Sequence, residues 1–202
     1  SDKRRTIDPV GMISDSLEGY LSYFLASDRF TEILTNILTE YGIRKINFLP
    51  TSLAESLYLI PSEVRDEYAL LLDIGYMSMT FGVVCGNGIK TETYTVSLSE
   101  VKEKVKEGLD LICEVINKCL ELCGDRSIDY KPILLTGGGI THIRGAREHI
   151  SNRLNKVVEI LTPNLPYYNK AAQSSLLSLL DMALSDRREK SFIYKILYGF
   201  GG

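Results

Sequence analysis

Apolar and polar residues along this chain follow two different periods, one typical of strands and one typical of helices. The most apolar run, YALLLDIG at residues 68–75, predicts a strand that is buried on both faces. Apolar side chains recur every three or four positions from Asp28 to Tyr41 and from Val101 to Cys123, which predicts two amphipathic helices. Asn87 and Gly88 separate two further strand-like runs and predict a β-hairpin.

The remaining elements complete an alternation of strands and helices. We expect an α/β fold with a mixed sheet that contains one antiparallel hairpin and is flanked by helices. The further strands are expected at residues 16–27, 43–50, 78–85, 89–96, 132–136 and 156–161, and the further helices at 52–60, 146–154 and 171–184.

Composition narrows the class of protein. The 202 residues are 45% hydrophobic and 24% charged, with a net charge of −3, which is the balance of a soluble globular protein. The sequence has no long basic stripe, which argues against a nucleic-acid partner, and no apolar run of about 18 residues, which favours a cytoplasmic chain. Four cysteines without metal-ligand spacing indicate reduced thiols in the core: Cys85, Cys113, Cys119 and Cys123.

The stretch DIGYMS at residues 73–78 follows the most apolar run. An aspartate at the carboxyl end of a strand, followed by glycine and a hydroxyl residue, suits a site for phosphate and magnesium. Gly75 lets backbone N–H groups approach phosphate oxygens, Ser78 can donate to them, and Asp73 can hold a hydrated Mg²⁺. The competing interpretation is that Asp73 only forms the turn, because aspartate is common in turns.

Three consecutive glycines, residues 137–139, stand in the stretch ILLTGGGITHIRG. Ordering a glycine costs more backbone entropy than ordering any other residue. Three in succession therefore indicate that the structure needs a backbone without side chains at this point. The glycines lie between a predicted strand and a predicted helix, where N–H donors can meet an anion or the edge of a ring. A tight turn without any ligand explains them equally well.

The two glycine turns, each after an apolar strand and separated by a hairpin and a long helix, resemble the actin-like ATPase fold (ribonuclease H-like), specifically the bacterial cell-division family FtsA. In that family a DIG strand with its hairpin forms the second phosphate loop, and an LTGGG turn holds the adenosine. The resemblance implies a partial actin-like domain at residues 5–186 and a tail at 187–202. It rests on RTIDPVGMISDSLEG (5–19), LPTSLAESLYLIPSEVRDEY (49–68), LTGGGITHIRGAREHI (135–150) and VVEILTPN (157–164).

The resemblance also implies cofactors and partners. ATP and Mg²⁺ would be the cofactors, with Asp73 holding Mg²⁺ through water. The partners would be further copies of the chain in an actin-like polymer and the tubulin-like division protein. The residues that would contact the nucleotide are Asp73, Gly75, Ser78, Gly137, Gly138, Gly139 and Ile140.

The chain departs from the family pattern on the phosphate side. It resembles the C-terminal portion of the family and lacks the family's first phosphate loop. Tyr76 and Met77 stand where the family has residues whose backbone lies on the phosphates. Only a few residues between Val96 and Val101 replace a whole subdomain, which in the family carries the docking site for the tubulin-like protein. We therefore expect that this chain alone does not hydrolyse ATP.

Residues 187–202, RREKSFIYKILYGFGG, combine basic and apolar side chains. Their apolar residues share one helical face, which suits an anionic membrane surface and agrees with the membrane-targeting helix of the FtsA family. The other interpretation is that this face packs on the domain's own core or in a partner interface. The face consists of Phe192, Ile193, Ile196, Leu197 and Phe200.

The sequence thus leaves two functions open. The first is an FtsA-like scaffold that is cytoplasmic, peripheral at the inner face of the cell membrane, and tethers division proteins there with an incomplete ATP site. The second is an active ATPase of the actin, Hsp70 and sugar-kinase superfamily, of which this chain is a fragment.

Overall fold

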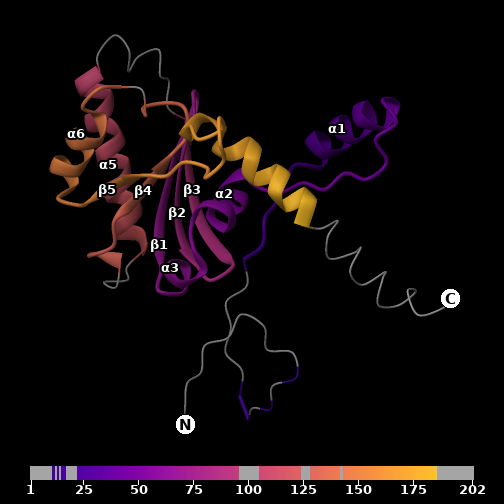
Figure 1. The fold of residues 1–202 in the computed structure, drawn as a ribbon, viewed down its shortest axis with the longest axis horizontal. Helices are drawn as coiled ribbons and strands as arrows, with labels where there is room; N and C mark the ends of the chain where they lie inside the picture. The colour runs from indigo at the N-terminus through magenta and orange to yellow at the C-terminus, as the bar shows by residue number, and fades with distance from the viewer. Residues whose placement is uncertain are drawn as a thin grey trace.

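The computed structural model describes residues 11, 13, 15, 16, 22–95, 105–123, 128–141 and 143–185. Its centre is a five-stranded sheet in the order β3-β2-β1-β4-β5 (Figure 1). β1, β4 and β5 run parallel, and β2 is antiparallel to both β1 and β3. This mixed sheet with its hairpin confirms the predicted fold class. The strands are β1 (Ala69–Ile74), β2 (Ser78–Cys85), β3 (Gly88–Thr95), β4 (Ile133–Thr136) and β5 (Val158–Ile160).

Helices cover both faces of the sheet. α5 (Val105–Cys123) and α6 (Ala146–Leu154) pack on one face. α2 (Thr51–Leu59) packs on the other, and α3 (Ser62–Asp66) follows it at the hairpin end of the sheet. A 3-10 turn at Ala171–Gln173 leads into a helix at residues 174–185, and α1 (Asp28–Glu40) lies apart from the sheet (Figure 1).

The most apolar strand is buried on both faces, as its composition predicts. Successive side chains of a strand point to opposite faces of the sheet. Leu70 and Leu72 therefore enter the core beneath α5 and α6, and Leu71 enters the core beneath α2. The next residue that faces α2 is Asp73, at the carboxyl end of β1. Cys113 and Cys119 are buried inside the larger core, as predicted, whereas Cys85 is only half-buried.

Two of the predicted strands are not found. Residues 43–50 have no regular secondary structure, and neither do residues 22–27, the end of the predicted strand at 16–27 whose residues 17–21 lie outside the described part. A strand needs a neighbour to accept its backbone hydrogen bonds. Within the described residues, ladders of backbone hydrogen bonds connect the five strands of the sheet and no other segment. The apolar segments at 22–27 and 43–50 therefore have no strand to pair with.

Some predictions fall outside the described residues. These are the short junction after Val96, the start of the long helix at 101–104, and the proposed membrane face at 192–200. None of the described helices has both the length and the hydropathy that crossing a bilayer requires.

Candidate functional site

The two glycine turns meet at the carboxyl ends of β1 and β4. The strands are neighbours, and their register places Asp73 opposite Thr136. Each turn therefore leaves the sheet at the same edge. The backbone N–H of Gly139 donates to the carbonyl oxygen of Ile74 over 2.7 Å, which ties the GGG turn to the DIG turn.

Packing between these two turns explains two of the three glycines. Gly137 has a φ of +93°, a conformation that favours glycine, and a Cβ there would overlap the Asp73 carboxylate and the Ile74 carbonyl. A Cβ at Gly139 would overlap the carbonyl oxygens of Ile74 and Gly75. The bare backbone is thus required by the chain itself. Gly138 is different, because it is exposed, and a Cβ there would lie 3.0 Å from the Cβ of Ala172.

The DIG turn is closed by its own backbone. The N–H of Gly75 donates to the carbonyl oxygen of Ser78 over 2.9 Å, so this donor is already used. Tyr76 and Met77 are 65% and 68% exposed, and Ser78 is exposed as well. Two bulky side chains therefore stand at the tip of the turn on which phosphates would have to lie.

A buried polar cluster lies beneath the turns, on the α2 side of the sheet. Alternation along β4 directs Thr136 to this side, where its hydroxyl donates to Ser174 Oγ over 2.7 Å. Ser175 Oγ donates to Glu55 Oε1 over 2.6 Å. The side chain of Glu55, on α2, is fully buried, and its other oxygen, Oε2, has no hydrogen-bond partner among the described residues. The cluster joins α2, β4 and the helix at 174–185.

Burial shifts the two carboxyl groups here, those of Glu55 and Asp73, toward their neutral forms. Burial, followed by the charge of Asp73, raises the pKa of Glu55 to about 7, although the Ser175 hydrogen bond lowers it. Burial also raises the pKa of Asp73. A proton on either carboxyl competes with a cation, so the Asp73 carboxylate suits Mg²⁺ less well than its place at the strand end suggests. The described residues contain no group of three metal-ligating side chains.

We expect Glu55 to make the stability of the protein depend on pH. Between the ordinary value of 4.5 and about 7 the folded chain holds a proton on Glu55 that the unfolded chain releases. The free energy of unfolding should therefore fall as pH rises through this range, by at most about 1.4 kcal/mol per pH unit. Glu55→Gln should remove this slope, whereas Glu32→Gln on the exposed α1 should keep it. Urea unfolding at pH 5, 6, 7 and 8 measures the difference, and equal slopes in all three proteins would contradict the assignment.

A cavity of about 210 Å³ lies on the other side of the GGG turn, against α6 and β5. This is below the roughly 300–1,000 Å³ of typical small-molecule pockets, and suits a single ring system. Among the predicted nucleotide residues only Ile140 lines it, whereas Asp73, Gly75, Ser78 and the three glycines at 137–139 do not. The walls are Leu135, Ile140, Ile143, Gly145 and Ile160, and the polar rim is Thr141, Arg144, Arg147 and Glu148.

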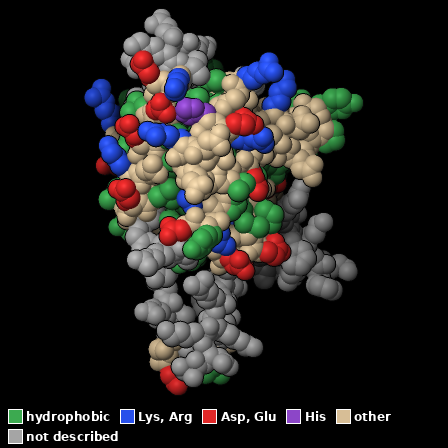
Figure 2. Space-filling model, turned by 90° about the vertical axis from the view of Figure 1, so that its left-hand side faces the viewer, with side chains coloured by type: hydrophobic (Ala, Val, Ile, Leu, Met, Phe, Trp, Pro, Cys, Tyr) green, Lys and Arg blue, Asp and Glu red, His purple; other side chains and the backbone are tan. Residues whose placement is uncertain are grey.

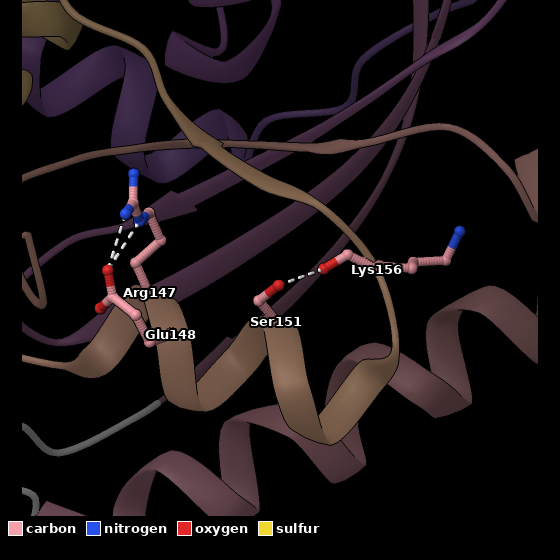
Figure 3. A network of polar contacts seen from close by, with 4 residues as sticks. All are labelled: Arg147, Glu148, Ser151 and Lys156. Carbon is pink, nitrogen blue, oxygen red and sulfur yellow. Dashed lines mark hydrogen bonds and ion pairs between the residues drawn. The ribbon is translucent and has the colours of Figure 1, made fainter.

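The first and last turns of α6 are fixed by short polar contacts (Figure 3). Arg147 Nη2 donates to Glu148 Oε1 over 2.7 Å, which holds the guanidinium at the cavity rim. Ser151 Oγ donates to the carbonyl oxygen of Lys156 over 2.7 Å. Arg144, which also lines the cavity, is exposed.

Charges of both signs are mixed on this face of the molecule. Figure 2 shows Lys and Arg side chains interspersed with Asp and Glu over the α6 side. One close pair joins α5 to α6, where His149 Nε2 and Asp110 Oδ1 are 2.9 Å apart. This face therefore offers no continuous basic surface to a nucleic acid.

Sequence patterns could have found some of these residues but not others. The glycine turns and Asp73 follow recognisable strands, so their motifs were visible. Glu55, Ser174 and Ser175 were missed, because each looks like an ordinary helix residue and becomes part of the cluster only through packing. A charged residue among the apolar positions of α2 was the only local signal for Glu55.

Comparison with known proteins places this geometry in a fold family. No family model and no curated protein matches the sequence. The structure is similar to that of the ethanolamine utilization protein EutJ from Carboxydothermus hydrogenoformans, with a TM-score of 0.57, 14% identity and coverage of 76% of this chain and 61% of that one. It is also similar to a chain of the PilM-PilN type IV pilus biogenesis complex, with a TM-score of 0.58, 18% identity and coverage of 74% and 57%.

A third similar structure is MreB 5 of Spiroplasma citri bound to AMPPNP, with a TM-score of 0.59, 12% identity and coverage of 82% of this chain and 68% of that one. The chain spans 61% of the EutJ chain and 57% of the chain in the PilM-PilN complex. The identities of 12–18% are too low to assign a family, FtsA included, and show the fold alone. The mixed sheet flanked by helices nevertheless matches the fold of these neighbours, which is that of the actin-like ATPases.

Proposed function

We propose that this chain is an actin-fold scaffold that binds an adenine nucleotide beside the GGG turn and works by assembly rather than by hydrolysis. The observation that carries the proposal is the cavity against Ile140 and Thr141, directly after the turn that resembles an adenosine-binding turn. Its lining combines apolar side chains with polar ones in nearly equal parts and includes Arg144, so it suits a flat ring with an anionic substituent. The similar MreB 5 structures bound to AMPPNP and to ADP support a nucleotide as the ligand.

The phosphate side argues against hydrolysis by this chain alone. Phosphoryl transfer requires several donors and a metal ion positioned together. Here the N–H of Gly75 is used inside the turn, Tyr76 and Met77 occupy its tip, and burial favours the protonated form of Asp73. If Mg²⁺ accompanies the nucleotide, Asp73 is the residue that would hold it through water, and the ion would neutralise phosphate charge.

Nucleotide binding is expected to stabilise the folded chain. MgATP at about 100 times its Kd should raise the free energy of unfolding by roughly 2.7 kcal/mol. Arg144→Glu should reduce this gain, because it places a negative charge at the rim of the cavity. Arg29→Glu, on the exposed α1, is the matched control and should keep the full gain. Thermal unfolding with and without MgATP is the measurement.

Two outcomes of this experiment would count against the proposal. If MgATP does not change the thermal unfolding of the unaltered chain, the proposed nucleotide binding is wrong. If Arg144→Glu is stabilised by MgATP as much as the unaltered chain, the nucleotide does not bind at this cavity. Phosphate release from MgATP should stay at the level of buffer, and release that rises with the amount of chain would favour the second function, an active ATPase.

We further propose that the scaffold is of the FtsA type and acts at the inner face of the cell membrane. The support is the resemblance of the four sequence stretches and the tail at 187–202. Self-association and a protein partner are part of this proposal, and the similar chain in the PilM-PilN complex is an example of an actin-like fold held in a protein complex. The tubulin-like division protein is the specific partner that the resemblance suggests.

The membrane role of the tail predicts binding to anionic vesicles. Phe192→Glu combined with Ile196→Glu places two charges on the apolar face and should abolish most co-sedimentation with liposomes that contain phosphatidylserine. Tyr198→Glu lies off that face and should have a smaller effect. Pelleting that is the same in all three proteins would contradict the membrane role.

A further inference from the structure

α1 presents an apolar face that nothing in the described chain covers. None of its 13 residues is buried, yet its apolar side chains recur at helical spacing. Phe30, Ile33 and Ile37 are 56%, 48% and 45% exposed. An amphipathic helix in a folded protein normally buries such a stripe, so the face is suited to an additional element.

The surroundings of α1 explain why this face is open. The segments on both sides of the helix, at 22–27 and 43–50, form no strand that could lie beneath it. One ring contact, between Phe30 and Phe48 with centroids 6.3 Å apart, packs the helix against its own flanking segment. Figure 1 shows α1 at the side of the molecule, away from the sheet.

The charge of α1 restricts what can cover it. Asp28, Glu32 and Glu40 are acidic and only Arg29 is basic, so the helix is net negative. An anionic membrane would be repelled, and so would α1 of a second copy. The helix at 174–185 also has exposed leucines, but it is not suited to cover α1 either. Its only charged residue is the acidic Asp181, so it offers no positive charge to the acidic side chains of α1. The missing element should be apolar on one face and basic.

The tail of this chain has that composition. Residues 187–202 contain four basic residues and one acidic residue, together with an apolar pattern of helical spacing. The tail begins directly after helix 174–185, which runs toward the side of the molecule where α1 lies (Figure 1). At about 3.3 Å per residue, sixteen residues can reach roughly 50 Å, which is ample for an intramolecular contact.

We propose that residues 190–200 dock on the apolar face of α1. The apolar side chains of the tail then cover Phe30, Ile33 and Ile37, and its lysines lie near the acidic side chains of α1. Because the same tail face is proposed to bind the membrane, docking on α1 and binding to an anionic surface exclude each other. This last step rests on the proposed membrane role, whereas the docking itself does not.

Hydrogen exchange of the α1 amides in the full chain tests the docking. Ile196→Glu should accelerate exchange across residues 28–40 by roughly tenfold, because a charge enters the contact. Tyr198→Glu is the matched control off the apolar face and should leave the rate within about twofold. Equal rates in all three proteins would overturn the proposal, and protection that increases with protein concentration would assign the contact to a second copy and overturn it as well.

A charge exchange and a vesicle titration complete the test. Glu32→Lys with Glu40→Lys should accelerate exchange in α1, and adding Lys190→Glu with Lys195→Glu should restore protection.

Vesicles containing phosphatidylserine should also accelerate hydrogen exchange in α1, because they release the tail. If vesicles do not bind but Ile196→Glu still exposes α1, the docking stands and the membrane role fails. If vesicles bind and exchange in α1 is unchanged, the docking fails.

Discussion

Gly137→Ala is expected to destabilise the fold by about 3–4 kcal/mol. The new Cβ would overlap the Asp73 carboxylate and the Ile74 carbonyl, and such overpacking typically costs about 1–3 kcal/mol. The residue would also have to keep a φ of +93°, which costs a further 1–2 kcal/mol or so for alanine. Neither β1 nor β4 can move away easily, because each is hydrogen-bonded to strands on both sides.

Gly145→Ala is the matched control for this effect. Gly145 has a similar φ of +82°, but a Cβ there would meet no atom within 4 Å. Its substitution should therefore cost only the conformational strain, about 1–2 kcal/mol. Urea unfolding of both variants separates packing from strain. Equal losses would show that contact with β1 is not the reason for the glycine, and would favour a ligand as the reason.

Arg65→Ala should destabilise the protein by about 3 kcal/mol or more. The side chain is 8% exposed and contacts both the end of α2 and the β2–β3 hairpin. Removing it would leave buried carbonyl oxygens without a donor, and hydrogen bonds to charged groups contribute about 1.5–3 kcal/mol each. Burial lowers the pKa of Arg65 without neutralising it. It donates to the carbonyl oxygens of Ser56, Leu57, Ile60 and Gly86 and to the side-chain oxygen of Asn87.

Two further variants sharpen this prediction. Arg65→Lys keeps the charge but loses the planar fork, so it should recover less than half of the lost stability. Arg147→Ala removes an exposed arginine whose partner is its neighbour Glu148, and should change stability by no more than about 0.5 kcal/mol. Thermal unfolding of the set is sufficient, and an equal loss for Arg65→Ala and Arg147→Ala would contradict the structural role of Arg65.

The patterns in the sequence predicted most of the fold. The strand at 69–74, the hairpin and the long helix follow from periodicity and from turn residues, which act over a few neighbouring positions. The same reasoning failed for 22–27 and 43–50. These segments have the composition of strands, but whether a strand forms depends on a partner that can be far away in the sequence.

The sequence by itself determined where the two glycine turns stand, that each follows an apolar strand, and that the phosphate side departs from the pattern of the FtsA family that the sequence resembles. The tertiary structure decided why Gly137 and Gly139 are bare, because the contact that requires it is made with Ile74 and Gly75, more than sixty residues earlier. It also decided that Glu55 belongs to the buried polar cluster beneath the two glycine turns. Its carboxyl lies against Ser175, and its pKa depends on burial and on the nearby Asp73, which no local pattern encodes.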